Sequence, residues 1–588
     1  GTRVDAEALA RQLGVPVAPI IASRGRGVEE LTMRVGELVF GGSEGFGKAV
    51  VSPTRAPAAA SASDALVQRY YRARELLDGV VEYAPVKHTL TEQIDRWVLN
   101  RYLGIPVFLL MMYLMFTIAV NFGAVFIDFF DILFGAIFVD GTRWVMSSVS
   151  MPEWLIVLVS DGLGGGIQLV ATFIPVIGFL FLCLSLLEDS GYMSRAAFVV
   201  DRLMARIGLP GTAFVPLIVG FGCNVPAVMA SRSLGRESDR LMTISMAPFM
   251  SCGARLTVYA LFASAMFPSN GSNVVFLLYL LGIAMAVGTG YVFRKQIFTR
   301  EVTPSFQEMP AYHIPVPRNI LLTTWFRLRS FVFRAGKTIV GVVVILSFLN
   351  SFSFDGTFGH QDTGSSALAT IGKEITPAFA PIGLHEDNWP ATVGLFTGVF
   401  AKEAVVGTLD ALYSGPGEPK GDGAPDIGGA AIAALVSIVD NAAGLADLLL
   451  DPLGVSAIHG DEDVGAAAAE QGVATSTLTN MAAAFGTQFA AYCYLVFVLL
   501  YATCVAVMGT IAKEAGWKWM VLVVFWTTSL AYVTASVIYQ AGTLPSHPLF
   551  SSLWIAGSLV FMAVFIHQLR TIGRRALPGD LIRVVQIG

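Results

Sequence analysis

Thiol, amide and carboxylate side chains lie inside otherwise apolar stretches of this sequence, where they could act as metal ligands. There are five cysteines, and an odd number within apolar segments does not indicate a disulfide framework. Sulfur, amide and carboxylate donors together favour a borderline divalent transition metal over Mg²⁺ or Ca²⁺, which prefer oxygen alone. Such a set could bind Fe²⁺, and it would also accept Zn²⁺ or Mn²⁺. The candidate metal ligands are Cys223, Cys252 and Glu403, with Asn224, Cys504 and Glu188 as weaker members.

Three of these candidates, Cys223, Asn224 and Glu403, lie in polar segments that glycine or proline interrupts. The first segment, Gly220–Ala227, contains Cys223 and also Pro226, which lacks a backbone donor and disturbs the preceding turn. The second, Gly398–Gly407, contains the ionisable pair Lys402–Glu403 inside an apolar span, and such a pair indicates function. Interrupted segments at corresponding positions of two halves are typical of a transporter site at a repeat interface.

The two segments can be aligned as parts of an internal repeat. When Gly220 is aligned with Gly398, Cys223 corresponds to Ala401. The second half then supplies its ligand two residues later, at Glu403.

A second similarity follows each segment. Met246–Arg255 in the first half and Tyr501–Ala506 in the second both contain a cysteine that directly follows a small polar residue. These cysteines are Cys252 and Cys504. We therefore predict two pseudo-repeated halves.

Because an ion must also leave the protein, several partial sites fit permeation better than one closed cage.

Each candidate also has a structural interpretation. A membrane cysteine commonly serves as a small packing residue, and we favour that role for Cys183 and Cys493. The pair Lys402–Glu403 could neutralise another buried charge such as Arg255. Glu188 could cap the end of its span rather than attract cations.

The composition requires a membrane protein. Of the 588 residues 54% are hydrophobic and 14% charged, whereas globular domains carry roughly 25% charged residues. The stretch between Arg101 and Asp128 has no charge and is long enough to cross a hydrocarbon core about 30 Å thick. We expect an all-α polytopic protein with about eight to ten crossings, in which 207–231 and 389–412 could be broken or re-entrant. The further predicted spans are 166–187, 241–264, 273–293, 337–354, 482–511, 519–540 and 549–567.

The distribution of charge predicts the orientation. Basic clusters occur around Arg294, Arg327 and Arg574, which places both termini on the cytoplasmic side by the positive-inside rule. Residues 414–480 contain ten acidic residues and a single lysine, Lys420, so we expect this acidic loop on the outer side. The net charge is −5, and no basic patch interleaved with aromatic residues is present, so we expect no nucleic-acid partner.

The first 97 residues differ from the rest. Val4–Leu13 has helical spacing, Val15–Ile21 is strand-like, and a helix is expected from Val28, an order typical of the end of a soluble α/β domain. The Gly/Ser/Ala-rich linker that follows contains Gly42–Lys48, which fits the phosphate-binding loop pattern. Because Ala49 replaces the Ser or Thr that would bind Mg²⁺, we interpret this as a chance match.

At its interrupted segments the chain resembles the ferrous iron transport protein B family of bacterial iron(II) transporters, in its gammaproteobacterial form. The stretches that carry the resemblance are Asn100–Pro106, Leu187–Met193, Val219–Pro226, Ala247–Leu256 and Ala401–Leu409. In that family the two interrupted segments are called Gate motifs, and their cysteines are proposed to line the iron path. The resemblance implies this role for Cys223 and Cys252, with Glu403 in the second motif.

The resemblance also implies a cytoplasmic G domain that binds and hydrolyses GTP with Mg²⁺. Ile21–Gly27 resembles the last guanine-contacting loop of that domain, so Ala22 and Ser23 are its remnant. No Ser/Thr-bearing phosphate loop or Asn-x-x-Asp motif accompanies that loop. We therefore expect an N-terminally truncated family member that does not bind GTP with useful affinity. Whether the chain is an enzyme stays open. We expect a G-domain remnant at 1–39, a linker and shortened helical connector at 40–97, membrane halves at 98–350 and 351–570, and a cytoplasmic tail at 571–588.

The expected function is uptake of Fe²⁺ across the bacterial inner membrane, driven or regulated by GTP in the intact protein. The lipid bilayer is its environment, and small cytoplasmic accessory proteins and further copies of the chain are candidate partners. Two alternatives stay open. One is a Gate-family permease for a nucleoside or another solute, and the other is a membrane-anchored GTPase switch without transport.

Overall fold

The computed structural model describes most of the chain from Thr2 to Arg575. The predicted ligand Glu403 and the predicted guanine-contacting pair Ala22 and Ser23 lie outside the described residues. The described residues are 2–13, 15–20, 26–40, 62–83, 90–100, 102–268, 270–298, 309, 311–359, 361, 363–400, 402, 404–414, 426–444 and 473–575.

The chain divides into two compact units, of which the smaller comprises Gly1–Trp97 and Val316–Asn319. Its helix α1 begins where Asp5 caps it by accepting from the backbone N–H groups of Glu7 and Ala8, at 3.0 and 3.1 Å. The strand expected at Val15–Ile21 is wrong for its described part, because residues 15–20 form no strand. An antiparallel pair forms instead, with Val4 opposite Val81. The elements are β1 Thr2–Val4, α1 Ala6–Leu13, α2 Val28–Phe40, α3 Ala62–Leu77 and β2 Val81–Tyr83, followed by α4 Leu90–Val98.

The larger unit begins with two unusually long helical rods. Gly104–Ser148 contains 45 residues and Glu153–Asp189 contains 37. At 1.5 Å per residue these rods are about 68 and 56 Å long, well beyond the bilayer core of about 30 Å. The first rod consists of α5 Gly104–Thr117, η2 Ile118–Phe122, α6 Ile127–Phe134, η3 Gly135–Asp140 and α7 Gly141–Ser148. The second consists of α8 Glu153–Ile156, η4 Val157–Gly164 and α9 Gly165–Asp189. The segments η2, η3 and η4 have π-helical geometry.

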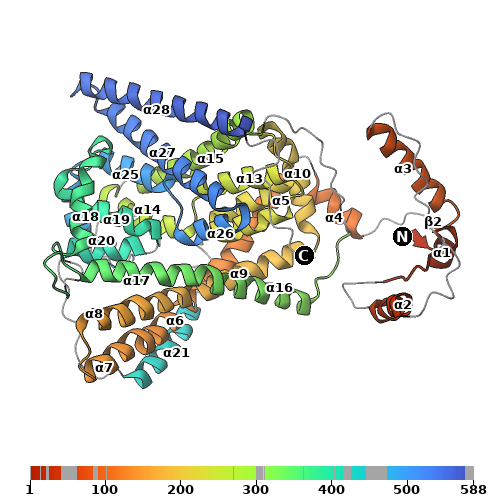
Figure 1. Cartoon of the computed structure of the whole chain (residues 1–588), viewed down its shortest axis with the longest axis horizontal. Helices are drawn as coiled ribbons and strands as arrows, with labels where there is room; N and C mark the ends of the chain where they lie inside the picture. Colours follow the sequence, from red (N-terminus) through yellow and green to blue (C-terminus); the bar gives the residue numbers. More distant parts are fainter. Residues whose placement is uncertain are drawn as a thin grey trace. The chain divides into compact units, whose positions relative to one another are not determined.

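The rods continue past the span limits expected from sequence, because their acidic residues have partners. Asp131 accepts a hydrogen bond from Gln168 on α9 at 2.8 Å, and Asp128 accepts one from Asn441 at 2.8 Å. Asn441 belongs to α21 (Ile427–Ala443), a helix inside the predicted acidic loop that contacts α6. Figure 1 shows α6, α7, α8 and α21 together at one end of this unit, which we call the helical extension.

Asp161 ties the helical extension to the neighbouring helix α17 (Lys337–Ser351). Its carboxylate pairs with Arg143 on α7 and accepts from Gln361 at 2.7 Å. Its backbone carbonyl accepts from Ser347 on α17 at 3.2 Å. The π-helical turn of η4 lets one residue present both its side chain and its carbonyl to different neighbours. The helix that leads into α17 consists of α16 Pro317–Phe331 and η8 Val332–Gly336.

The remaining helices form the rest of the larger unit. Gly191, at a φ of 82°, makes the left-handed reversal between α9 and α10 that a side chain would strain. In the first half these helices are α10 Tyr192–Ile207, α11 Phe214–Gly222, α12 Asn224–Ala230, α13 Glu237–Met246, α14 Gly253–Met266 and α15 Gly271–Gln296. In the second half they are α18 Ala367–Ile375, α19 Trp389–Phe400, α20 Ala404–Ser414, α24 Thr475–Phe485, α25 Gln488–Leu500, α26 Val505–Ala515, α27 Trp517–Gly542 and α28 Pro548–Arg575. Short 3-10 turns occur at Gly211–Ala213, Ser231–Ser233, η7 Ala247–Phe249, Thr376–Ile382 and Glu386–Asn388.

Within the described residues, eight helices are long and apolar enough to cross a membrane. The count becomes nine if Tyr192–Ile207 and Gly211–Gly222, which meet at a bend of 100°, form one broken span. The expectation of an all-α, multi-pass membrane protein is therefore confirmed. The sequence prediction that the segment around 207–231 is broken agrees with this bend.

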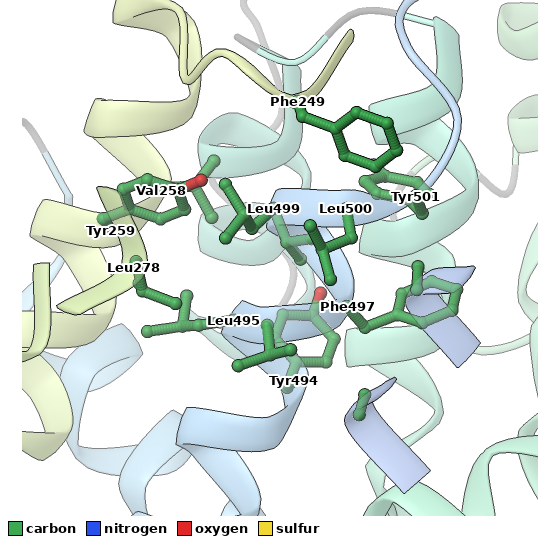
Figure 2. Packing of buried hydrophobic residues seen from close by; sticks show 14 of the residues in the cluster. Phe249, Val258, Tyr259, Leu278, Tyr494, Leu495, Phe497, Leu499, Leu500 and Tyr501 are labelled. Carbon is green, nitrogen blue, oxygen red and sulfur yellow. The ribbon is translucent and has the colours of Figure 1, made fainter. Parts of the chain in front are cut away.

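The largest buried cluster joins helices of both halves. Phe262 on α14 stacks on Tyr494 of α25, with ring centroids 5.0 Å apart, and meets Phe485 of α24 edge-on. Figure 2 shows the part of this cluster built around α25, including Leu495, Leu499 and Leu500. Every residue from Ala490 to Leu500 except Tyr492 is buried, so α25 is enclosed by protein on all sides. A helix surrounded in this way provides a rigid frame for the break that follows it.

Candidate functional site

Four helices in the core of the larger unit are interrupted, two in each half. In the first half the interruptions separate α11 from α12 and η7 from α14. In the second half they separate α19 from α20 and α25 from α26. Helices on either side of these breaks contact one another across the halves, since α12 contacts α26 and α14 contacts α20 and α25. We call this group of interruptions the four breaks.

The predicted cysteine ligands occupy one kind of position at three of the four breaks. Cys223, Cys252 and Cys504 each stand immediately before the first residue of a helix, namely α12, α14 and α26. Their backbone has left the helical region, with ψ values of 131°, 164° and 153°. At the fourth break α20 begins at Ala404, the residue after Glu403. Four of the ligands predicted at the breaks, Cys223, Cys252, Glu403 and Cys504, therefore directly precede a helix in the chain, where the first N–H groups have no partner within their helix. The fifth, Asn224, is the first residue of α12.

Pro226 lies just after the break, in agreement with the disturbance expected in the turn before it. It lies in the first turn of α12 rather than within a continuous span, and the helix has already stopped at Gly222. Proline is tolerated in a first turn because the missing N–H would have no intrahelical acceptor there. The break itself lies at the extended residue Cys223.

In the first half, Asn224 fastens the two breaks to each other. It is 4% exposed, and with its amide nitrogen facing the carbonyls it donates to Gly220 and Ala247, both at 3.0 Å. A Cβ on Gly220 would lie 3.0 Å from the Cβ of Met250, so a glycine is needed where the two segments cross. Asn224 thereby holds the end of α11 against η7, and both of its donor hydrogens have backbone acceptors.

In the second half, Tyr501 lies where the two breaks meet. It follows the last residue of α25 and is 3% exposed. A Cβ on Gly398 would lie 2.4 Å from its hydroxyl oxygen, so the phenol closes directly onto α19. The ammonium of Lys402, itself 3% exposed, lies 3.4 Å from the centroid of the Tyr501 ring.

The two halves share one register. Counted from Gly220 in the first half and Gly398 in the second, α11 and α19 end at the same place, two residues later. Four residues after each glycine stands the polar residue that contacts the next break, Asn224 or Lys402. The aligned glycines therefore mark structurally equivalent points.

Arg255 is a second buried cation near the breaks. It is fully buried and donates to the carbonyls of Pro248 and Met250, at 2.8 and 3.3 Å. In the described part of the chain its Nε and Nη2 have no hydrogen-bond partner.

An ion-pair group joins the halves at the far ends of the two short helices that follow Cys223 and Cys504. Arg232, just beyond α12, donates to Glu514 on α26 at 2.8 Å through Nε and also through Nη2. Arg240 on α13 contacts the Glu514 carboxylate at 3.3 Å and donates to its backbone carbonyl. The Glu514 side chain is only 5% exposed. We call these three residues the interhalf ion pair.

Glu188, the weakest of the predicted ligands, has a different neighbour. It ends α9, and its carboxylate pairs with Arg327 on α16 at 2.7 Å. Cys183 and Cys493 are buried in apolar clusters, where their thiols pack against hydrophobic side chains. Among the described residues no three His, Cys, Asp or Glu side chains lie close enough to hold a metal ion together.

A cavity of about 210 Å³ lies between α17, α18, α19 and α20 and reaches the break of the second half. Phe400 and Ala404, on either side of that break, line it, as do Ser347 and Asn350 on α17. Its walls are mostly apolar with a few hydroxyl and amide groups.

Sequence reasoning missed three participants of this arrangement. Tyr501 could have been singled out by its place beside Cys504, but a tyrosine in an apolar segment is usually a packing residue. Arg232 and Glu514 lie in polar stretches at span ends and gave no signal of their own. Their partners come from the other half of the chain, and only the folded structure brings them together.

The larger unit is an all-helical, multi-pass membrane domain with a pair of interrupted helices in each half. A family model named Gate and described as nucleoside recognition matches residues 170–266 and 332–518, and one described as ferrous iron transport protein B C terminus matches 275–327. The chain is 42% identical to the Fe(2+) transporter FeoB of Escherichia coli (strain K12), an alignment that spans 97% of this chain and 79% of the relative. It is 46% identical to the Fe(2+) transporter FeoB of Legionella pneumophila (strain Paris), over 86% of this chain and 67% of that relative. The chain belongs to the ferrous iron transport protein B family. No solved structure matches it.

Proposed function

We propose that this protein carries Fe²⁺ across a membrane through the region where the four breaks meet. The observation that supports this most directly is the shared position of Cys223, Cys252 and Cys504, each directly before a helix at a break. Interrupted backbone is tolerated at membrane depth where it is enclosed by protein or lines a cavity. Family membership and the names of the relatives, Fe(2+) transporter, support the choice of ion.

The proposed chemistry is stepwise ligand exchange rather than storage in a closed site. A thiol at each of three breaks, with the carboxylate of Glu403 and the amide of Asn224 nearby in sequence, offers soft and hard donors in succession. The lack of a three-ligand group among the described side chains is compatible with weak partial sites that an ion can leave. We propose Glu188, paired with Arg327, as a charge at the mouth of the path rather than a ligand within it.

We further propose the bacterial inner membrane as the location, with both termini on the cytoplasmic side. The basic residues on α15 and α16, including Arg294 and Arg327, support this orientation. In longer relatives a G domain with GTP and Mg²⁺ would drive or regulate transport, and Ala22 and Ser23 would belong to its guanine-contacting loop. Small cytoplasmic accessory proteins and a homo-oligomer are part of the same proposal.

The test is uptake of Fe²⁺ into liposomes that contain the whole chain, under anaerobic conditions. We expect uptake above that of protein-free liposomes, and we expect Cys223→Ser combined with Cys252→Ser to abolish most of it. The matched control is Cys183→Ser combined with Cys493→Ser, which removes two packing thiols and should leave the rate within about twofold. Equal rates for the two double variants would contradict the ligand assignment.

A nucleoside permease is the second candidate, because the Gate model carries the description nucleoside recognition. A nucleoside site needs aromatic and amide groups that converge on an open pocket, whereas thiols precede the helices at three of the breaks here. Uptake of radiolabelled nucleosides by the same liposomes separates the two. Nucleoside uptake without Fe²⁺ uptake would favour the second candidate.

A further inference from the structure

Lys402 is a charged side chain held deep in the helical core, at the break between α19 and α20. It is 3% exposed, and its ammonium lies 3.4 Å from the centre of the Tyr501 ring. At that distance the cation rests on the negative face of the phenol, and the attraction grows when water is excluded. The face of Tyr501 therefore already holds a cation in this structure.

This cation lies at the junction of the two breaks of the second half. The hydroxyl of Tyr501 closes on Gly398, and Cys504, directly before α26, follows Tyr501 by three residues in the chain. Lys402 itself precedes the candidate ligand Glu403 in the chain. The ammonium therefore lies where the segments of these two breaks meet.

The first half shows that this register does not require a charge for structural reasons. The residue equivalent to Lys402 is Asn224, an uncharged amide that bonds to the carbonyls of Gly220 and Ala247. Both residues reach across to the next break of their half, but only the second half uses an ammonium. A flexible four-carbon stem also lets a lysine withdraw its charge, which an amide fixed by two carbonyls cannot do.

We propose that the Lys402 ammonium is a resident cation that occupies a cation subsite on Tyr501 when no metal is bound, and that the transported divalent ion must displace it. The inference rests on the proposed iron transport. Displacement lowers the apparent affinity for the metal, which keeps binding weak enough for release. It also disfavours monovalent ions, since a single charge gains little by replacing another single charge.

The test is a titration of the purified whole chain with Co²⁺ alone, as an air-stable probe of the Fe²⁺ site, followed by thiolate-to-cobalt absorption. Lys402→Met removes the charge but keeps an unbranched side chain of similar length. We expect at least about tenfold tighter Co²⁺ binding, equivalent to about 1.4 kcal/mol. Lys402→Gln, which imitates the amide of the first half, should behave in the same way and serves as the second variant.

Two controls follow: one keeps a positive charge at residue 402, and the other removes a different lysine that lies over an aromatic ring. Lys402→Arg retains a cation that can rest on the ring and should stay within about threefold of the wild type. Lys373 also lies over an aromatic ring, 4.9 Å from the centroid of Trp389, but it is exposed at the surface. Lys373→Met should leave Co²⁺ affinity unchanged.

A chemical complementation separates occupation of the subsite from a merely structural role. In Lys402→Ala, added ethylammonium should fill the vacated place and weaken Co²⁺ binding towards the wild-type value, whereas ethanol should not. If the wild type transports Fe²⁺ but Lys402→Met and Lys402→Gln bind Co²⁺ no more tightly than the wild type does, the resident-cation inference is wrong and the proposed iron transport still stands. A wild type that neither binds Co²⁺ nor transports Fe²⁺ overturns both.

Discussion

Gly398 and Gly220 are points of close approach between segments at the breaks. At Gly398 a Cβ would meet the Tyr501 hydroxyl at 2.4 Å and a methyl group of Val405 at 2.7 Å. Neither neighbour can withdraw easily, since Tyr501 and Val405 are both buried. Gly398 is therefore a contact point between α19 and its neighbours, and its role is steric.

Replacement of Gly398 by alanine should destabilise the protein by about 1–3 kcal/mol, the usual cost of overpacking a filled core. The measurement is the thermal unfolding of the protein in detergent. Gly407, in the helix after the same break, is the matched control, because a Cβ added there would have no atom within 4 Å. Gly407→Ala should be neutral or slightly stabilising because alanine favours helix. A Gly398→Ala protein as stable as Gly407→Ala would contradict the contact described here.

At the residue scale the sequence was informative where polar residues disturb an apolar pattern. Cys223, Cys252 and Cys504 stood out because glycine, proline or small polar residues mark the helix ends beside them. Tyr501 did not stand out, since its sequence neighbourhood resembles that of Tyr494, which is a core residue. What distinguishes Tyr501 is the ammonium of Lys402, a contact from a separate segment that no periodicity reports.

Among the elements, the helix pair α12 and α26 connects the halves most directly. Both helices begin directly after a candidate thiol ligand, and Arg232 and Glu514 join their far ends. Any motion that separates the two halves at this end must break this contact. The interhalf ion pair thus holds the two halves together at the far ends of α12 and α26.

A double-mutant cycle on Arg232→Ala and Glu514→Ala measures this coupling. Because the Glu514 side chain is 5% exposed, we expect a coupling energy of about 1–3 kcal/mol in thermal or denaturant unfolding. The control cycle uses Arg327 and Glu188, whose side chains are 29% and 39% exposed, and should give about 0.2–1 kcal/mol. A smaller coupling for the Glu514 pair than for the control pair would refute the assignment.

The sequence predicted the repeat at the element scale but not the way its breaks are made. Counting from the glycines gave the right register, because α11 and α19 end at equivalent residues. The disturbance expected in the turn before Pro226 agrees with the break at Cys223, but the sequence did not show that a new helix begins before the proline. The structure has it in a first turn, where its missing donor costs little.

For the molecule as a whole, the helical extension is the largest departure from the sequence expectation. The span count agreed, but the limits at Asp128 and near residue 166 were set by charge alone. Charged residues continue a helix when partners are supplied, as Gln168 and Asn441 do for Asp131 and Asp128. Those partners lie on α9 and α21, far along the chain, so no local pattern could have revealed them.

The proposed orientation predicts opposite labelling of the two ends of the larger unit. In a cysteine-free background, Val149→Cys lies in the turn between the two rods, at a residue 62% exposed. It should react with a membrane-impermeant maleimide in intact spheroplasts. Lys295→Cys, at the end of α15, should react only in inside-out vesicles. Labelling of both positions from the same side would contradict the orientation.

The length of the first rod has a mechanical consequence. Gly104–Ser148 is one helical rod of 45 residues that begins near the cytoplasmic end in the proposed orientation and ends in the helical extension. A tilt of only about 5° at its base would sweep its tip sideways by about 6 Å, given a length of about 68 Å. The rod therefore acts as a lever arm that converts a small angular change on one face of the membrane into a displacement wider than an iron ion on the other.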